Sequence, residues 1–432
     1  MNRSPRRARS TFLSLSCVFV VLAGSAVVVL AGGAPAAAQS NWPQFRGPDG
    51  QGHADAAQLP VTWSEGEHVT WKTPIPGTGW SSPVIWDGQI WMATATDEGR
   101  SLRAVCVDSQ SGEVLRDVEV FHHGEVMLIN PKNSYASPTP VIEAGRLYVN
   151  YGTLGTACLD TATGEVLWRN EKLLLDHKEG PGSSPILYGN LLLIHCDGID
   201  VQYVIALDKQ TGETVWQTWR SQPMDDNPDF CKAYSTPLVI NVGGRDQLIS
   251  VGAHWVYSYD PATGQENWMA GFRGFSNVPR PVYDGEHVYV CTGFMKPQLL
   301  AIRPDGAGDV TESHVDWNAA RQVPNNPSPI LVDGMIFMAS DRGVATCLDA
   351  ATGEEHWVER LEGNFSASPI YASGRLYFPN EQGQTFVVAA APEFELLATN
   401  TLDDGHMASF AVTGDALIVR TRSHLYRIED CR

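Results

Sequence analysis

The sequence predicts an all-β fold, an eight-bladed β-propeller whose blades are four-stranded antiparallel sheets. Three observations predict it: a repeated turn phrase, a second repeated phrase that opens each unit, and two chain ends that each hold part of one unit. The chain has 432 residues, of which 43% are hydrophobic and 18% charged, so it can bury a large core. Repeats of this length are typical of propellers and solenoids.

The first repeated phrase ends one strand, makes a turn and reaches a tryptophan. Its copies read LDTATGEVLW, LDKQTGETVW, YDPATGQENW and LDAATGEEHW. Asp caps its own backbone and Gly accepts the positive φ of a tight turn, so the phrase predicts a hairpin. We expect the aromatic column of this phrase to pack between neighbouring blades: Trp71, Trp168, Trp216, Trp268, Trp317 and Trp357.

The second phrase begins with a hydroxyl residue and a proline, followed by two short apolar strands. One copy reads SSPVIWDGQIWMAT from Ser81. Proline at the first residue of a strand suits an innermost strand with one unpaired side. Eight such units predict eight blades, since the opening positions are Pro83, Pro140, Pro185, Pro237, Pro281, Pro329, Pro369 and, in the last unit, Phe410.

The two ends of the chain together supply the four strands of the eighth blade. The last unit stops after its third strand, while a tryptophan phrase without a third strand stands near the N-terminus at Gly66 to Trp71. We therefore expect residues 69–72 to pair with residues 425–428 and close the ring, which removes both exposed edges. The predicted organisation is a signal peptide at 1–38, an N-terminal extension at 39–65 that packs on the ring, and one propeller domain at 66–432.

The first 38 residues read as a secretory signal. Arginines at positions 3, 6, 7 and 9 precede an apolar run, and small residues lead to an expected cleavage after Ala38. A retained membrane anchor is the alternative, because about 20 apolar residues can span a bilayer. After cleavage we expect no membrane span, and a periplasmic or extracellular location. The net charge of -19 argues against nucleic acid as a partner.

The cysteines do not indicate a disulfide framework. Cys106, Cys158 and Cys347 share a repeat column whose other members are alanine and serine, so we expect small buried thiols there. Cys231 lies in a loop and Cys431 at the C-terminus. A disulfide of Cys231 stays open at this stage.

One residue breaks the hydroxyl column that precedes the opening prolines. Ser or Thr fills seven of the positions, and Arg280 fills the eighth. If this column faces the channel, Arg280 can bind a carboxylate or phosphate there. A local salt bridge is the alternative.

The long polar connections between blades supply the other candidate ligand-binding residues. A carboxylate cluster in the third connection suggests either calcium or a solvated acidic loop, and we expect no metal site. These candidates are His123, Tyr135, Asp225, Asp226, Asp229, Arg273, Arg321 and Asn326. No familiar catalytic motif is visible, so no catalytic residue is predicted.

The SSPV and TGExxW phrases resemble the PQQ-like repeats of quinoprotein dehydrogenases, and also those of the propeller lipoprotein in the outer-membrane barrel-assembly machinery. The resemblance to the dehydrogenases implies a quinone held by calcium, an Asp, an Arg, a Trp and a pair of adjacent cysteines. This sequence has no adjacent cysteines and lacks the long insertions.

Two functions remain in view. The first is a non-catalytic binding or scaffold propeller, expected to be monomeric and without a cofactor, that holds a protein, glycan or small ligand. The second is an oxidoreductase that uses PQQ with calcium.

Overall fold

The structure is a computed structural model that describes residues 41–56 and 58–430. These residues belong to one compact unit, Ala38–Arg432. The predicted signal peptide, its cleavage after Ala38 and the thiol of Cys431 lie outside the described residues.

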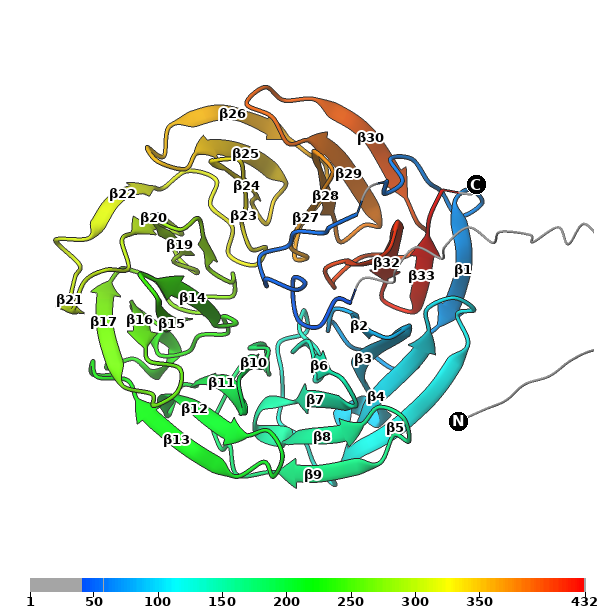
Figure 1. Ribbon diagram of the computed structural model, residues 1–432, viewed down its shortest axis with the longest axis horizontal. Coiled ribbons are helices and arrows are strands. Elements are labelled where there is room, and N and C mark those ends of the chain that lie inside the picture. Colours follow the sequence, from blue (N-terminus) through cyan, green and yellow to red (C-terminus); the bar gives the residue numbers. More distant parts are fainter. Residues whose placement is uncertain (1–40, 57, 431–432) are drawn as a thin grey trace, which may run out of the picture. The chain divides into compact units, whose positions relative to one another are not determined.

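Eight sheets surround a central channel, which confirms the predicted propeller (Figure 1). Each blade is an antiparallel meander whose first strand lies nearest the channel. Blades 1 to 4 consist of β2(Val84–Trp86), β3(Gln89–Thr96), β4(Ser101–Asp108), β5(Val114–His122); β6(Val141–Glu143), β7(Arg146–Asn150), β8(Thr156–Asp160), β9(Val166–Asn170); β10(Ile186–Tyr188), β11(Leu191–Asp197), β12(Gln202–Asp208), β13(Thr214–Trp219); and β14(Leu238–Val242), β15(Arg245–Val251), β16(Trp255–Tyr259), β17(Glu266–Gly271).

Blades 5 to 8 repeat this arrangement. They consist of β18(Val282–Tyr283), β19(Val288–Cys291), β20(Leu299–Ile302), β22(Val315–Ala319); β23(Ile330–Val332), β24(Met335–Ala339), β25(Val344–Asp349), β26(Glu355–Arg360); β27(Ile370–Ala372), β28(Arg375–Pro379), β29(Gln384–Ala389), β30(Leu396–Thr401); and β31(Ala411–Thr413), β32(Ala416–Arg420), β33(His424–Ile428) with the N-terminal β1(Val69–Pro74).

The N-terminal strand closes the ring as predicted. β1 pairs with β33 in antiparallel register, so that Lys72 lies opposite Tyr426 and Thr73 opposite Leu425. Blade 8 thus has the strand order β1-β33-β32-β31. Because the first strand, β1, and the last strand, β33, share one sheet, the ring has no open blade.

Blade 4 departs from the predicted four strands. β21(Gly308–Asp309) adds a fifth strand, parallel to β17, with Trp268 opposite Gly308. The connection between β20 and β22 is long, whereas other blades have a tight turn at this place. It folds back onto the outer edge of the preceding blade.

Four of the turn glycines lie against a tryptophan of the preceding blade, whereas Gly164 lies against Arg116 and Val118. A Cβ added at Gly212 would lie 2.5 Å from Trp168 Cε3, and one added at Gly264 would lie 2.5 Å from Trp216 Cε3. The Trp168 indole N–H also donates to the Lys209 carbonyl at 3.1 Å. Glycine is therefore required here for two reasons: the turn has a positive φ, and the indole ring leaves no room for a Cβ atom. Trp71 and Trp317 make the same kind of contact with Gly112 and Gly353, whereas Trp268 and Trp357 donate to the Pro304 and Ala391 carbonyls.

The apolar core is divided among the interfaces between blades. The cluster between blades 4 and 5, for example, combines Ile249 and Trp268 with Val288 and Leu300. The thiols of Cys106, Cys158 and Cys347 are free and buried, and so is that of Cys231. Burial raises the pKa of the Cys158 thiol to about 11.

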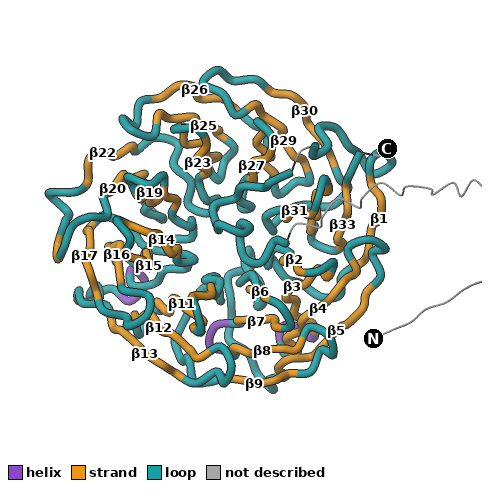
Figure 2. The backbone as a smooth tube through the Cα atoms, in the orientation of Figure 1, coloured by secondary structure: helices purple, strands orange, loops and turns teal. Residues whose placement is uncertain are grey.

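Strands dominate the described chain, and its short helices lie in connections (Figure 2). They are the 3-10 turns η1(Asp97–Gly99), η2(Gly152–Leu154) and η3(Pro228–Phe230). Within the described ranges, no helix reaches the length and apolar character that a bilayer crossing requires.

Residues 41–56, here called the N-terminal segment, cross the centre of the ring (Figure 1). Trp42 exchanges backbone hydrogen bonds with Ile85 of blade 1, and Tyr371 of blade 7 bonds the backbone of Gly52 and Ala54. The Gln51 side chain accepts from the Tyr283 N–H of blade 5 at 2.6 Å. The segment therefore ties together blades that are distant around the ring.

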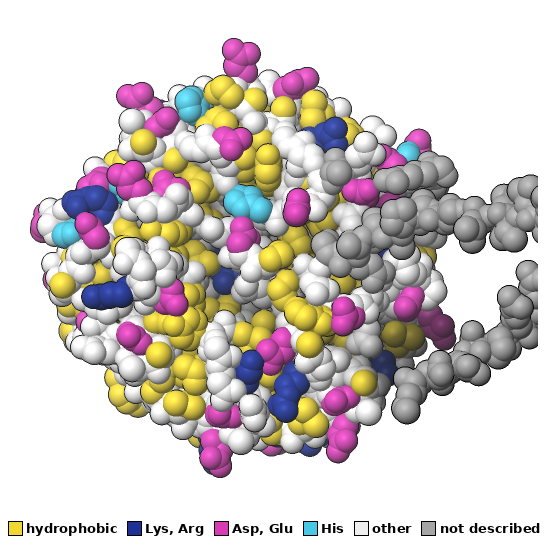
Figure 3. All heavy atoms as spheres, in the orientation of Figure 1, with side chains coloured by type: hydrophobic (Ala, Val, Ile, Leu, Met, Phe, Trp, Pro, Cys, Tyr) yellow, Lys and Arg dark blue, Asp and Glu magenta, His cyan; other side chains and the backbone are white. Residues whose placement is uncertain are grey.

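The face drawn in Figure 3 carries acidic side chains spread around the ring among apolar and uncharged ones. They form no single patch there. This dispersed charge is typical of a solvated surface.

Candidate functional site

The hydroxyl residues that precede the first strands form a chain of hydrogen bonds around the channel that is broken between Thr236 and Arg280. The backbone N–H of Ser82 donates to Thr139 Oγ1 at 2.9 Å, and that of Thr139 donates to Ser184 Oγ at 2.9 Å. The same bond recurs at the other blades, except from Thr236 to Arg280, and ends at Ser409, whose N–H donates to Ser82 Oγ at 3.1 Å. We call this set the crown: Ser82, Thr139, Ser184, Thr236, Ser328, Ser368 and Ser409.

Arg280 interrupts the crown and binds the chain itself. Its Nε donates to the Pro237 carbonyl at 3.1 Å, and its Nη1 donates to the Phe45 carbonyl at 2.7 Å. Its Nη2 donates to Gln44 Oε1 at 3.2 Å. Burial, and after it the charge of the neighbouring Arg46, lowers the pKa of the Arg280 guanidinium to about 9. The break in the column is thus the point where the ring holds the N-terminal segment.

A second tier of side chains stands above the crown, two residues earlier in each blade. Because side chains alternate along extended backbone, residues two apart point the same way. All of these positions line one cavity together with the crown: Trp80, Ser137, Gly182, Tyr234, Val278, Asn326, Ser366 and Met407. The crown is uniformly Ser or Thr, whereas this tier holds seven residue types in eight blades.

The cavity has a volume of about 540 Å³, which lies in the range of small-molecule sites. Phe45 of the N-terminal segment also lines it, beside the crown. The connections between blades supply further walls, including Asn130 and Glu179, and the loop between β19 and β20 of blade 5 supplies Phe294. We call the side on which these connections lie the loop face.

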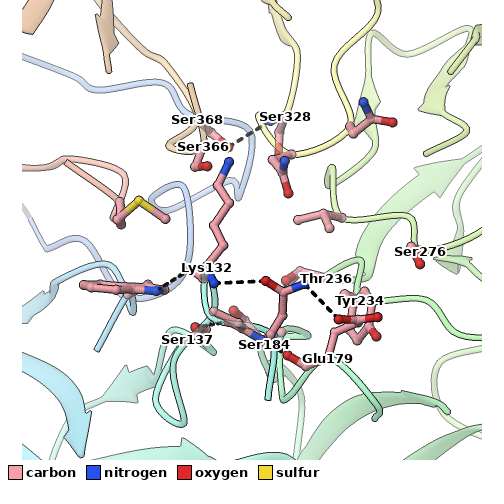
Figure 4. Close-up of a pocket in the computed structure, with 18 of the residues that line it drawn as sticks. Lys132, Ser137, Glu179, Ser184, Tyr234, Thr236, Ser276, Ser328, Ser366 and Ser368 are labelled. Atoms are coloured by element: carbon pink, nitrogen blue, oxygen red, sulfur yellow. Dashed lines mark hydrogen bonds between the residues drawn. The ribbon is translucent and has the colours of Figure 1, made fainter. Parts of the chain in front are cut away.

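The charged groups of the cavity are already paired. Lys132 extends across the cavity toward Ser366 and Ser368 (Figure 4) and forms an ion pair with Glu381 at 2.7 Å. Glu179 accepts from Asn130 Nδ2 at 2.9 Å. Lys232 is buried, and its Nζ donates to the Asp229 carbonyl at 2.7 Å. Burial lowers the pKa of Lys232.

Aromatic rings form two parts of the cavity wall. Phe275 stacks on Phe230 at 4.5 Å between centroids and meets Phe294 edge-on at 5.7 Å. At another part of the cavity wall, the Trp80 indole N–H donates to the Lys132 carbonyl at 3.0 Å. The arrangement offers flat apolar surfaces beside hydroxyl and amide groups, which suits binding of an amphipathic ligand.

The predicted ligand-binding residues do not meet in one place. Asn326 lines the cavity and bonds Asp341. Tyr135 donates to the Met127 carbonyl at 2.7 Å inside its own loop, and His123 Nε2 bonds the Leu154 carbonyl at 2.9 Å beside a separate shallow hollow. The remaining side chains of the set are placed as follows: Asp229 pairs with Lys178, Asp225 lies 3.6 Å from His254, and Asp226, Arg273 and Arg321 are exposed.

The described residues hold no group of three or more His, Cys, Asp or Glu side chains with the geometry of a metal site. A quinone would draw on Arg280 to bind a carboxylate. Each nitrogen of that guanidinium already donates to an acceptor of the chain. The residues around Arg280 therefore do not fit the quinone that the repeats imply.

The sequence analysis did not predict two features of the site, the second tier and the buried Arg46. No residue type occurs at all eight positions of the second tier. Its one regularity is that each position lies two residues before the hydroxyl column, and this spacing could have identified the tier from the sequence. Arg46 stands in a segment that looked like an ordinary set of turns. In the structure Arg46 is 1% exposed, and burial lowers its pKa to about 10.

Comparison with known proteins gives a family match over most of the chain. Residues 71–357 and 313–416 match the family model described as outer membrane protein assembly factor BamB. A curated relative, the quinoprotein alcohol dehydrogenase PedH of Pseudomonas putida, is 26% identical over 163 residues, which are 35% of this chain and 24% of that protein. The match thus spans about a quarter of that relative's length.

Solved structures share the propeller at low identity. BamB from Moraxella catarrhalis is 11% identical with a TM-score of 0.56, over 83% of this chain and 99% of that one. A europium-containing methanol dehydrogenase is 11% identical with a TM-score of 0.54, over 90% and 89%. The computationally designed Ika8 protein is 11% identical with a TM-score of 0.57, over 86% and 100%. These likenesses concern the fold.

Proposed function

Because this chain belongs to the family of the outer membrane protein assembly factor BamB, we propose that it is an exported scaffold that binds a polypeptide partner on its loop face. The leader-like N-terminal sequence supports export, to the periplasm or beyond. The family description supports an assembly role, and the exposed apolar side chains of the loop face support binding at that face.

Those side chains carry the proposal. Leu128 is 91% exposed, Met295 68%, Leu174 67% and Phe294 53%. With Met224 they form what we call the rim, and they stand on connections that also supply cavity residues such as Asn130 and Glu179. Exposed apolar side chains grouped around a polar depression mark interaction sites. Each rim residue would gain about 1–3 kcal/mol from full burial by a partner.

Site-specific photocross-linking tests this function. A photoreactive benzoylphenylalanine replaces Leu128 or Met295 in the full chain, produced and exported in its own host. The matched control places the same group at Leu396 of β30, which is 45% exposed on an outermost strand.

We expect one discrete adduct with the same partner polypeptide from positions 128 and 295, and none from position 396. Adducts of equal yield at all three positions would show that the loop face has no special role. Absence of adducts at positions 128 and 295 would also contradict the proposal.

The quinone-dependent oxidoreductase is the weaker candidate. It needs a channel arginine that holds cofactor, and Arg280 instead binds Gln44 and Phe45. Added PQQ and calcium should therefore give no dye reduction with alcohols or sugars, whereas turnover would restore this candidate.

A further inference from the structure

The crown leaves its hydroxyl hydrogens without a protein acceptor. Each crown oxygen accepts a backbone N–H from a neighbouring blade, as Thr236 does from Ser184 at 3.1 Å. None of these hydroxyls donates to an acceptor among residues 41–56 and 58–430. A hydroxyl carries one donor besides its two acceptor positions. The cavity therefore contains a ring of O–H groups whose donors remain available.

Positive charge is concentrated beside this ring. Arg46 and Arg280 are both buried, and the negative charge of Asp49 attracts both guanidinium groups. Asp49 is itself bonded to His53 Nδ1 at 2.9 Å. Two buried guanidinium groups thus share one counter-charge that is already paired.

Arg46 has no hydrogen-bond partner among the described residues for any of its three guanidinium nitrogens. A Cβ added at Gly52 would lie 2.9 Å from Arg46 Nη2 and 3.2 Å from the Pro369 carbonyl, which follows Ser368 of the crown. The free guanidinium therefore lies near the crown. A buried cation without an acceptor is costly, and a bound anion removes that cost.

We propose that the crown binds an oxyanion, a carboxylate or phosphate group of a ligand that enters from the loop face, in the field of Arg46 and Arg280. This inference rests on the proposed binding function and names the chemistry recognised at the base of the same cavity. The variable second tier then selects the rest of the ligand, since it holds seven residue types in eight blades.

Calorimetric titration at constant ionic strength tests the inference. The probes are inorganic phosphate, succinate as a carboxylate, and maltose as an uncharged ligand of similar polarity. Phosphate and succinate separate the two sources of oxyanion, because the better binder identifies the natural group.

Two matched pairs of variants locate the site. Arg46→Gln removes the unpaired charge, while Arg245→Gln removes an exposed charge at the start of β15. Thr139→Val removes a crown hydroxyl at nearly constant shape, while Thr139→Ser keeps it. Circular dichroism verifies that each variant is folded before titration.

We expect at least one oxyanion to bind, with affinity about tenfold weaker in Arg46→Gln and several-fold weaker in Thr139→Val. Thr139→Ser and Arg245→Gln should bind as the original chain does. Binding of maltose alone, no binding of either oxyanion, or equal binding by Arg46→Gln would overturn the inference. If neither oxyanion binds but photocross-linking at the rim gives the expected adduct, the oxyanion site is refuted and the proposed scaffold function is retained.

Discussion

The contact between a turn glycine and the tryptophan of the preceding blade leads to a quantitative prediction. Gly212 has φ +75° and its open side faces Trp168, whereas Gly145 has φ +77° and open space around it. Alanine at either position costs about 1–2 kcal/mol for the left-handed backbone. Only at Gly212 does the added methyl group meet an indole ring, which adds about 1–3 kcal/mol of overpacking.

We therefore expect Gly212→Ala to lower the free energy of unfolding by about 2–5 kcal/mol, and Gly145→Ala by about 1–2 kcal/mol. Denaturation with guanidinium chloride, followed by circular dichroism, measures both. In a Trp168→Ala background, the cost of Gly212→Ala should fall to that of Gly145→Ala, because the ring is gone. Equal losses for the two glycines in the original chain would refute the reasoning.

Three further predictions concern the channel. Thr236→Val leaves the Ser184 N–H without its acceptor and should cost about 1–3 kcal/mol, while Thr236→Ser should cost under about 0.5 kcal/mol; chemical denaturation distinguishes them. Burial lowers the pKa of His406 to about 4, so between about pH 6.5 and 4 the unfolded chain binds this proton and the folded chain does not; this histidine should cost about 3 kcal/mol of stability over that range, and His406→Leu should make the profile shallower by that amount while His177 and His195, which are lowered in the same way, keep their share. Arg280→Ser releases Gln44 and Phe45, so trypsin should cleave after Arg46 at least about tenfold faster; an unchanged rate would show that the arginine does not hold the segment.

The fold was predictable because its signals are local and repeated. The turn phrase fixed the outer hairpin of most blades, and the incomplete C-terminal unit led to the pairing of residues 69–72 with 425–428. The fifth strand at Gly308–Asp309 was not foreseen, since a two-residue parallel pairing leaves no pattern in the sequence.

The candidate site was predictable only in part. The hydroxyl column singled out Arg280, but its partners Gln44 and Phe45 lie more than 200 residues earlier in the chain, and no spacing rule connects them. The residue type in the second tier changes from blade to blade, so a search for recurring residues does not detect it. Long-range pairs such as Lys132 with Glu381 depend on the closed ring and cannot be deduced from either loop alone.

Native-state hydrogen exchange of the N-terminal segment tests the central claim most directly, namely that this segment is a built part of the channel. The amides of Trp42, Gly52 and Ala54 donate to Ile85, Arg46 and Tyr371. We predict that they exchange as slowly as amides of the blade strands. Exchange at the rate of an unstructured peptide would contradict the account, because the segment would then lie free of the ring.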